Sequence, residues 1–411
     1  MSKNETLDQQ VAQLMSGTEY GDLDLKQAMA DELRARLVQA QKEGRPLQVY
    51  CGFDPRTSDL HLGHTVPMRK MRQFQEYGHE VTMVIGRFTS LIGDASDQNS
   101  VRAQISFEEA TRNAESYAEQ AFRILDPEKT HIAYNDTWLA ELRFADLIQL
   151  TQNFTIQQFL SRDNFRKRWD AGDPIFLHEM FYAIMQGYDA LHLKADIQIG
   201  GTDQLFNIIT AARKLMEAEG LLPNIGIILG ILPGTDGEVK MSKSLGNHIP
   251  LRSSPEDMYG KVMSVPDKAM PAYYRLVTRW SPAEIDRIEA ELKTGRLHPR
   301  DAKMRLAREV ISIYHGDEYV QGAEEAFRRV FQQGDLPKDM PLLTLDAPRL
   351  LVDLIVEEGL AQSKSEARRL IKQNGIKLND EVVAEIDLLL EPGPERVLRV
   401  GKRRFLRIHS P

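Results

Sequence analysis

The sequence has almost no cysteine: Cys51 is the single one in 411 residues. One cysteine excludes an internal disulfide and any zinc site built from several cysteines. A long hydrophobic run is also missing, because the longest one, near residues 225–232, contains glycine and is too short to cross a bilayer. The first residues are polar and acidic and lack the apolar core of a secretory signal. We therefore expect a protein of the reducing cytoplasm without a membrane segment.

An excess of positive charge is absent as well, since 52 Lys and Arg against 60 Asp and Glu give a net charge of −8. This excludes a generally basic nucleic-acid binder. The charge is uneven, however. From residue 345 onward there are 12 Lys and Arg against 11 Asp and Glu, which leaves 40 against 49 in the remainder. A local basic face near the C-terminus could still contact RNA.

A chain of 411 residues exceeds one ordinary core and predicts two or three domains. Helix is expected over about residues 5–44. Strand and helix patterns then alternate, which predicts an α/β domain with a doubly wound (Rossmann-like) parallel sheet covered by helices on both faces. The predicted strands are residues 49–53, 81–85, 130–134 and 197–199, and helices are predicted at 65–77 and 101–125.

Beyond this region the pattern becomes helical, with helices predicted at 255–262, 269–280, 282–293, 299–314 and 319–331. A stretch with glycine, prolines and charges then resembles a linker. We predict a catalytic domain over 1–248 that includes the N-terminal helical segment, a helical domain over 249–331, a linker over 332–344 and a small α+β domain over 345–411.

One short string follows the first predicted strand. Residues 50–55 (YCGFDP) lead through a loop to His61-Leu62-Gly63-His64, which opens a helix. A spacing of three puts both imidazoles on one face of the helix end, where free backbone N–H groups attract anions. Imidazole adds donors for a phosphate, and Gly63 leaves room for a flat ring. Taken alone, the two histidines could also be surface residues or a buried pair.

A second string, Lys240-Met241-Ser242-Lys243-Ser244, comes much later in the chain. Its lysines flank a turn-rich loop and could hold a leaving pyrophosphate as point charges, although such a run is usually only a solvated loop. Both strings, in this order, are far harder to obtain by chance. Together they resemble the two signatures of class I aminoacyl-tRNA synthetases.

Over essentially its whole length the sequence resembles tyrosyl-tRNA synthetases of the bacterial type. The matching pieces are residues 50–55, 61–64, 91–94, 182–189, 200–204 and 240–244. The resemblance implies activation of L-tyrosine by ATP to tyrosyl-adenylate and pyrophosphate, and then transfer of tyrosine to the 3′ end of tRNA(Tyr). It also implies Mg²⁺ as the companion of ATP, no tightly bound prosthetic group, and a homodimer.

Tyr182, Gln186 and Asp189 occupy positions i, i+4 and i+7 of a helix predicted over 176–191, so they share one face. That face could bind a ligand, or it could simply be wet while the apolar residues of the helix form the core. The resemblance assigns Tyr50 and Asp189 to the phenolic hydroxyl of the substrate tyrosine.

Other roles follow from the resemblance alone. It assigns Asp94, Tyr182 and Gln186 to the α-ammonium group and Gln204 to the vicinity of the reacting carboxylate. The implied catalytic residues are His61, His64, Lys240 and Lys243. The implied ATP-binding residues are Cys51, Gly52, Asp54, His61, Gly63, His64, Gly201, Asp203, Met241 and Lys243. For Cys51 a small buried hydrophobe remains an open alternative.

The final segment carries two basic clusters. Residues 363–366 form a capping-box pattern, which predicts a helix that Gly375 ends. The clusters are Arg368, Arg369 and Lys372 in this helix, and Lys402, Arg403 and Arg404 near the end. By charge alone they could contact RNA phosphates or be solvated surface. The resemblance implies a small RNA-binding domain, which is shared with a ribosomal small-subunit protein.

Two other functions stay open. The chain could be another nucleotidyl-transferring enzyme of this superfold, such as a tryptophanyl-tRNA synthetase, or a non-catalytic RNA-binding protein derived from a synthetase. Tyr50 together with Asp189 argues against tryptophan, because indole has no hydroxyl group for that pair. Two intact signature strings argue against a mere binder.

Overall fold

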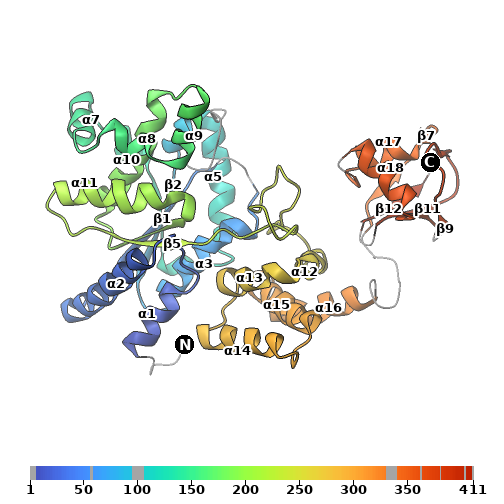
Figure 1. Cartoon of the computed structure of the whole chain (residues 1–411), viewed down its shortest axis with the longest axis horizontal. Coiled ribbons are helices and arrows are strands. Elements are labelled where there is room, and N and C mark those ends of the chain that lie inside the picture. The colour runs from blue at the N-terminus through green and yellow to red at the C-terminus, as the bar shows by residue number, and fades with distance from the viewer. Residues whose placement is uncertain are drawn as a thin grey trace. The chain divides into compact units, whose positions relative to one another are not determined.

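The computed structural model describes residues 6–55, 59–94, 106–329, 340–361, 363–379, 381–401 and 404–409 (Figure 1). The chain divides into two compact units, residues 1–324 and 325–411. Within the described residues no helix is both long and apolar enough to cross a membrane.

A five-stranded sheet forms the centre of the first unit. Its strands are β1 (Gln48–Phe53), β2 (Glu80–Ile85), β3 (Thr130–Tyr134), β4 (Ile197–Gly201) and β5 (Ile225–Leu229), in the order β3-β2-β1-β4-β5. All neighbouring strands are parallel. The predicted doubly wound parallel sheet is thus confirmed. The sequence analysis missed β5, because a strand buried along its whole length shows no polar alternation.

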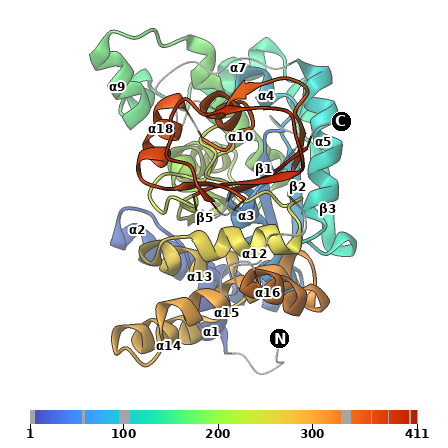
Figure 2. The same ribbon diagram turned by 90° about the vertical axis from the view of Figure 1, so that its right-hand side faces the viewer.

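The chain reverses its direction of winding between β1 and β4, so a crevice opens at their carboxyl ends, where ligands of such sheets bind. Two of the helices that flank the sheet are α3 (Leu62–Glu76) and α5 (Phe107–Ala121) (Figure 2). The helix predicted over 101–125 thus begins, in the described residues, at Phe107; residues 101–105 lie outside them.

The segment over 5–44 is largely helical, as expected, but it is interrupted. The structure has two helices, α1 (Leu7–Met15) and α2 (Leu23–Glu43). Gly17 and Gly21 between them have φ values of 76° and 71°, a left-handed conformation that glycine adopts without strain. The helical pattern of the flanking residues concealed this break.

Between β3 and β5 the chain forms shorter elements around one long helix, α10 (Leu177–Leu193). They are α6 (Asp136–Leu139), α7 (Phe144–Thr151), α8 (Ile156–Leu160), α9 (Asp163–Ala171), η2 (Thr202–Gln204), the π-helix η3 (Phe206–Ala212) and α11 (Arg213–Ala218). Two further short elements come earlier, α4 (Thr89–Ile92) and η1 (Pro127–Lys129).

The remaining helices of the first unit are α12 (Pro255–Ser264), α13 (Met270–Val277), α14 (Pro282–Lys293) and α15 (Pro299–Tyr314), with η4 (Asp267–Ala269) and η5 (Asp317–Tyr319) between them. Of these helices α13 packs on α3, and Tyr314 at the end of α15 shares a hydrogen bond of 2.6 Å with Thr65 of α3 between their hydroxyls. The helix α16 (Val320–Arg328) follows. The domain boundary predicted at 248/249 stays a prediction, since both parts lie in one compact unit.

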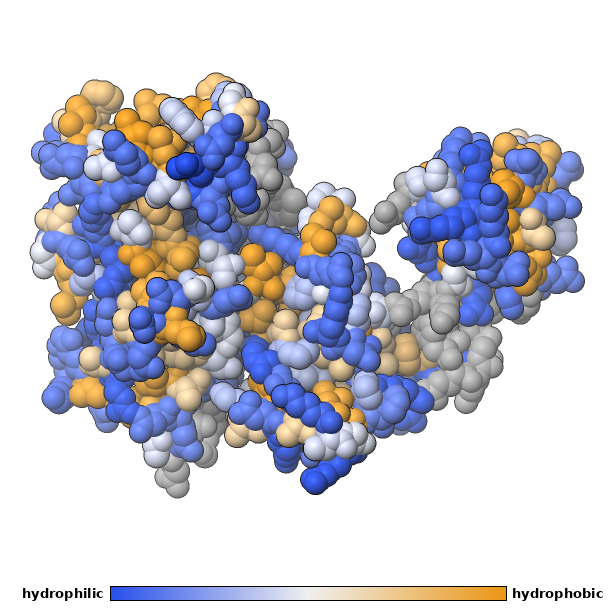
Figure 3. Space-filling view, in the orientation of Figure 1, coloured by the Kyte–Doolittle hydropathy of each residue, from blue (hydrophilic) through white to orange (hydrophobic). Residues whose placement is uncertain are grey.

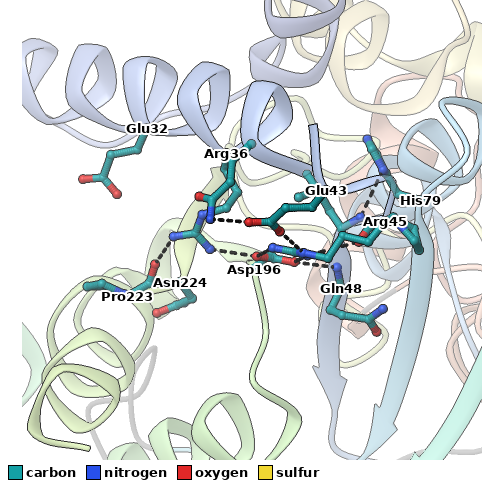
Figure 4. Close-up of polar contacts among 12 residues, drawn as sticks. Glu32, Arg36, Glu43, Arg45, Gln48, His79, Asp196, Pro223 and Asn224 are labelled. Carbon is teal, nitrogen blue, oxygen red and sulfur yellow. Dashed lines mark hydrogen bonds and ion pairs between the residues drawn. The ribbon is translucent and has the colours of Figure 1, made fainter. Parts of the chain in front are cut away.

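An ion cluster fixes α2 to the amino edge of the sheet (Figure 4). Asp196, just before β4, is only 5% exposed and accepts hydrogen bonds from Arg36 at 2.8 Å and from Arg45 at 2.7 Å. The backbone N–H of Gln48 donates to the same carboxylate at 3.0 Å. These charge-assisted bonds compensate the burial of the carboxylate and set the starts of β1 and β4 side by side.

The second unit has its own apolar core. A mixed sheet has the order β6 (Leu342–Thr344), β12 (Arg404–His409), β11 (Arg396–Val400), β8 (Ile376–Leu378) and β9 (Glu381–Val382), and β7 (Arg349–Leu350) pairs with β10 (Leu389–Leu390). Two helices, α17 (Leu351–Glu357) and α18 (Lys364–Lys372), contribute to the core beside the sheet.

The Ser363 hydroxyl caps α18 as predicted, by accepting a hydrogen bond from the Glu366 N–H. The helix ends at Lys372, before Gly375, and the left-handed residue that follows it is Asn374, with φ 56°. The Gly375 N–H donates to the Leu370 carbonyl at 2.8 Å. Asparagine tolerates this conformation better than most residues with a side chain.

Candidate active site

The first signature string forms the start of α3. His61 is the N-cap residue, and its Nδ1 accepts a hydrogen bond from the Gly63 N–H at 3.2 Å. The His64 Nδ1 accepts from the His61 N–H, also at 3.2 Å, and the two ring centroids lie 3.8 Å apart. Two histidines thus act as a capping box. Because both Nδ1 atoms are acceptors, the proton of each neutral ring is on Nε2.

Both imidazoles are uncharged at neutral pH. Burial lowers the pKa of His61 to about 2 and that of His64 to about 4, and the positive charge of Lys240 contributes to both shifts. Each ring therefore offers an Nε2–H donor next to the positive end of the helix dipole. Such an arrangement can bind an anion while both histidines stay neutral.

The second signature string packs against the first. Met241 is buried, and its N–H donates to the Leu232 carbonyl at 3.0 Å. A Cβ on Gly63 would lie 3.0 Å from the His61 ring and 3.5 Å from the Met241 Cβ, so a side chain here would press on the His61 ring. The Leu62 N–H donates to the Ile249 carbonyl at 3.0 Å, which joins the chain after the loop to the start of α3.

Asn247 organises the loop that carries the second string. Its Oδ1 accepts from the Ser242 N–H at 2.8 Å, and its Nδ2 donates to the Lys240 carbonyl at 3.2 Å and to Asp236 at 2.5 Å. The Asn247 carbonyl accepts from the Thr235 N–H at 2.8 Å. The sequence analysis did not identify this asparagine.

Each signature lysine contacts a carboxylate. The Lys240 Nζ lies 3.2 Å from Asp203, and the Lys243 Nζ lies 3.0 Å from Asp59. Both lysine side chains are about half exposed, and exposed ion pairs are worth at most about 1 kcal/mol. An incoming phosphate could therefore replace either carboxylate at little cost.

Asp189 lies buried behind the crevice, on α10. Its Oδ1 accepts from the Trp138 indole N–H at 2.7 Å and its Oδ2 from the Asn135 amide at 3.3 Å. Burial raises the pKa of Asp189 to about 7, against the effect of these two hydrogen bonds. Asp189 is only 3% exposed, so the alternative that this face of α10 is simply solvated is wrong for Asp189.

Tyr50 lies in β1 opposite α10. Its hydroxyl donates to the Gln186 carbonyl at 3.3 Å. Burial, followed by the negative charge of Asp189, raises the pKa of the Tyr50 hydroxyl well above its usual value. Tyr50 is therefore a neutral donor, and the structure brings it close to Asp189, as the predicted hydroxyl-binding pair requires.

The other predicted tyrosine-binding residues form a hydrogen-bonded chain. Gln204 Nε2 donates to Asp94 at 2.5 Å. Asn207 Nδ2, from the π-helix η3, donates to Gln204 Oε1 and to Gln186 Oε1, both at 3.0 Å. Asn207 thus contacts Gln204 and Gln186 directly and Asp94 through Gln204. Turns of π-helix are frequent at functional sites.

Asp54 connects the predicted tyrosine and ATP residues. The Tyr182 hydroxyl donates to Asp54 Oδ2 at 3.0 Å and the Thr89 hydroxyl to Asp54 Oδ1 at 2.7 Å. Tyr182 was predicted to bind tyrosine and Asp54 to bind ATP. A predicted ATP-binding carboxylate at the end of β1 therefore contacts a predicted tyrosine-binding residue.

The remaining predicted ATP-binding residues lie at the ends of β1 and β4. Cys51 is buried, and burial raises the pKa of its thiol, whereas Gly52 is exposed. A Cβ on Gly201 would lie 2.6 Å from Asp203 Oδ1, so a side chain here would displace the Asp203 carboxylate. The inert, buried thiol of Cys51 agrees equally with its alternative, a small hydrophobe.

The predicted RNA-binding residues lie in the second unit. Arg368, Arg369 and Lys372 are exposed on α18. Arg404 at the start of β12 lies 3.8 Å from Glu366 of α18, which places it beside that helix. Lys402 and Arg403 lie outside the described residues.

Sequence reasoning missed the residues that orient the predicted ones: Thr89, Asn135, Trp138, Asn207 and Asn247. A signal existed for Asn135, which directly follows the predicted strand 130–134, at the sheet edge where ligands bind. No local pattern pointed to the others, because each acts through a contact with a residue distant in the chain.

Comparison with known proteins gives a consistent result. The family model for class I tRNA synthetases of the tryptophan and tyrosine type matches residues 41–332, and the model for the tyrosine–tRNA ligase SYY-like C-terminal domain matches residues 331–408. The chain is similar to the tyrosine–tRNA ligase of Moorella thermoacetica, at 48% identity over 381 residues that cover 92% of each chain. It is also similar to that of Thermotoga maritima, at 45% identity over 372 residues, 90% of this chain and 92% of the other.

Solved structures agree in fold. The C-terminally truncated mitochondrial tyrosyl-tRNA synthetase of Aspergillus nidulans matches with a TM-score of 0.63 at 21% identity, over 80% of this chain and 95% of the other. The tyrosyl-tRNA synthetase of Archaeoglobus fulgidus complexed with L-tyrosine matches with a TM-score of 0.59 at 20% identity, over 78% of this chain and 99% of the other.

Proposed function

Because the chain belongs to the class I tRNA synthetases of the tryptophan and tyrosine type and has tyrosine–tRNA ligase activity, we propose that the side chains at the carboxyl ends of β1 and β4 carry out both steps of this activity. First, a carboxylate oxygen of L-tyrosine attacks the α-phosphorus of ATP, and pyrophosphate leaves. Then a terminal hydroxyl of tRNA(Tyr) attacks the carbonyl carbon, and AMP leaves. The substrate supplies each nucleophile, so the protein positions the reactants and stabilises charge.

Tyrosine binds between β1 and α10. The phenolic hydroxyl donates to Asp189 and accepts from Tyr50, while Asp94, Tyr182 and Gln186 surround the ammonium group. Gln204 lies near the carboxylate. The observation that supports this placement is the burial of Asp189. Its carboxylate accepts hydrogen bonds only from neutral donors, Trp138 at 2.7 Å and Asn135 at 3.3 Å, among the described residues. No cation contributes to its pKa shift. A hydroxyl donor in the pocket would supply the missing compensation.

His61 and His64 bind the phosphate oxygens through their Nε2–H groups, and these bonds strengthen as negative charge grows in the transition state. Lys240 and Lys243 leave Asp203 and Asp59 and bind the departing pyrophosphate. The loop that Asn247 organises carries both lysines, so it can move as a unit. Cys51, Gly52, Asp54, Gly63, Gly201, Asp203 and Met241 line the rest of the ATP site.

Single-turnover adenylate formation, measured beside equilibrium tyrosine binding, tests these roles. We expect His64→Ala and Lys243→Ala each to slow adenylate formation about a hundredfold, because one such donor contributes roughly 3 kcal/mol in the transition state. Tyrosine affinity should be unchanged. His131→Ala and Lys293→Ala, at exposed positions of β3 and α14, are the matched controls. A variant that forms adenylate at the wild-type rate, or that only binds tyrosine more weakly, would remove that residue from its role.

Mg²⁺ enters with ATP in this proposal and neutralises phosphate charge. Phosphate oxygens and water supply most of its ligands, as is usual for this ion. Among the described residues no group of three or more His, Cys, Asp or Glu side chains could hold a metal ion. The carboxylates nearest the phosphates in this proposal, Asp59 and Asp203, contact lysines.

We also propose a homodimer that works in the cytoplasm. The helices α7, α8 and α9 share a core with α10, yet they expose Phe144, Ile148, Ile156 and Trp169. Hydrophobic surface gathers in the region of these helices in Figure 3. Interface centres are rich in such residues. Sedimentation should give the mass of two chains, and Phe144→Ser with Ile156→Ser should give that of one. The single, buried cysteine is compatible with a reducing compartment.

A further inference from the structure

A cavity of about 350 Å³ adjoins the loop of the second signature string. It lies within the first unit, and its volume falls in the range of small-molecule sites. Its polar walls come from the segment before α3, from the chain that carries and follows the loop, and from both ends of α12. The side chains that matter here are Asp59, Lys243, His248, Arg252, Asp257 and Lys261.

The cavity collects positive charge from three places in the chain. Lys243 and Arg252 share Asp59, at 3.0 and 3.6 Å, and Lys261 contacts Asp257 at 2.5 Å. Arg252 also lies 3.6 Å from Glu119, so the three cations have three carboxylates as exchangeable partners. These side chains are all partly or largely exposed, so each ion pair is weak and exchangeable. An anion with several charges could replace the carboxylates.

The cavity lies beside the proposed phosphate site and shares Lys243 with it. The Leu251 N–H donates to the carbonyl of Leu60, the residue before His61, at 2.9 Å. The His248 ring centroid lies 6.0 Å from that of His61. Burial, followed by the charges of Lys261 and Lys243, lowers the pKa of His248, so this ring is neutral. Its Nδ1 is buried and has no hydrogen-bond partner in the described part of the chain.

We propose that this cavity is an outer polyphosphate site, in which Lys243, Arg252 and Lys261 receive the pyrophosphate that leaves ATP, and in which Asp59 is the carboxylate that the pyrophosphate displaces. Lys243 then belongs to both the phosphate site and the cavity, and it moves with the pyrophosphate from one to the other. When pyrophosphate departs, Asp59 pairs again with Lys243 and Arg252, which keeps the product from being trapped. The inference rests on the proposed function of the signature lysines.

The reverse reaction isolates this step. An oxygen of pyrophosphate attacks the α-phosphorus of enzyme-bound tyrosyl-adenylate, the bond from that phosphorus to the tyrosine carboxylate breaks, and ATP and free tyrosine form. Single-turnover rates of this reaction, measured on the full chain against pyrophosphate concentration, give a half-saturating concentration and a maximal rate.

We expect Arg252→Gln and Lys261→Gln each to raise the half-saturating pyrophosphate concentration roughly tenfold, the scale of one lost charge-assisted contact. The maximal rate should change less than threefold, because the α-phosphate contacts remain. Asp59→Asn should lower the half-saturating concentration, because it removes the competing carboxylate. A purely structural role would instead weaken pyrophosphate binding in all three variants.

Arg287→Gln is the matched control, since Arg287 lies on α14, outside the cavity lining, and forms an exposed ion pair with Glu284 at 4.0 Å. Wild-type tyrosine affinity in every variant shows that the fold is intact. The proposal is overturned if Arg252→Gln and Lys261→Gln behave like the control, or if Asp59→Asn binds pyrophosphate more weakly. It is also overturned if the variants raise only the KM for tRNA, which would make the cavity an RNA contact. Absence of tyrosine-dependent pyrophosphate exchange in the wild type would instead refute the proposed function.

Discussion

Asp189 and Asp196 are both buried, yet their pKa values are shifted in opposite directions. Burial alone raises the pKa of either carboxyl. Around Asp196, hydrogen bonds from Arg45, the Gln48 N–H and Arg36 outweigh burial and lower the pKa. Around Asp189 the donors are the neutral groups of Trp138 and Asn135, so burial prevails. The first carboxylate is compensated within the protein, and the second is left for a ligand to compensate.

At this scale we predict that tyrosine binding depends on pH with a midpoint near 7. Below the pKa of about 7, Asp189 in the free protein is protonated and offers the substrate hydroxyl only a weaker, neutral acceptor. Affinity should therefore fall as the pH falls through 7, by at most about tenfold per pH unit. Equilibrium binding of tyrosine between pH 5.5 and 8.5 measures this. Asp189→Asn should bind weakly at every pH, and a flat wild-type profile would contradict the assignment.

A second prediction at the residue scale concerns specificity. Tyr50→Phe removes one neutral hydrogen bond to the substrate hydroxyl, worth about 1 kcal/mol, so kcat/KM for tyrosine should fall several-fold to about tenfold. Phenylalanine makes no such bond, and its kcat/KM should not fall. Pyrophosphate exchange with each amino acid measures the ratio. An unchanged tyrosine/phenylalanine ratio would place the pocket elsewhere.

At the scale of elements, the amino edge of the parallel sheet stabilises the fold, whereas the carboxyl edge carries the candidate active site. The amino edge holds the cluster of Asp196 with Arg36 and Arg45, which locks α2 to β1 and β4 (Figure 4). The carboxyl edge carries the exchangeable pairs of Lys240 and Lys243. Strong, buried pairs stabilise the scaffold, whereas weak, exposed pairs leave the catalytic loop able to move.

We predict that Asp196→Ala destabilises the protein by about 3 kcal/mol, because it leaves the buried guanidinium of Arg36 without its carboxylate. Tyrosine affinity in the folded variant should stay near the wild-type value, because the cluster lies at the opposite edge of the sheet. Urea unfolding measures the loss, and Asp170→Ala, in an exposed pair with Arg166, is the control.

The pH dependence of this contribution has a definite sign. Asp196 has a lower pKa in the folded than in the unfolded state, so its stabilisation is complete above the unfolded value near 3.8 and disappears as the pH falls through the folded value. The destabilisation by Asp196→Ala should therefore be equal at pH 6 and pH 8. A destabilisation that grows between these two pH values would contradict this account.

At the scale of the whole molecule, the chain consists of two units with separate cores. Every residue proposed for tyrosine and ATP lies in the first unit, and the basic helix α18 lies in the second. Exposed arginines and lysines on a compact unit suit RNA phosphates, whose contribution to binding is independent of base sequence and falls steeply with salt. Chemistry and tRNA affinity should therefore be separable.

We predict that removal of residues 345–411 spares tyrosine-dependent pyrophosphate exchange and sharply reduces tRNA charging. Replacement of Arg368, Arg369 and Lys372 by glutamine should weaken tRNA binding and reduce its salt dependence by roughly one unit of slope per lost contact. Exchange and charging are measured on the same preparation. Full charging activity after truncation, or equal loss of both reactions, would contradict an RNA-binding role for this unit.

The sequence by itself determined the class of fold, the family and the local elements. Helices α14 and α15 have the predicted bounds, because Ser281 and His298 cap them and proline occupies their first turn, all within a few residues. The alternation of strands and helices predicted the parallel sheet for the same reason: periodicity is a local property. The two signature strings carried the chemistry because their residues act together as short segments.

Only the tertiary structure decided the states and partners of these residues. The sequence could not show that His61 caps α3, that Asp189 meets Trp138 and Asn135, or that Lys243 meets Asp59. Such contacts join residues far apart in the chain, and they exist only once the strands have paired and the loops have closed. Burial, and with it every large pKa shift at the site, likewise depends on what the rest of the fold places around a side chain.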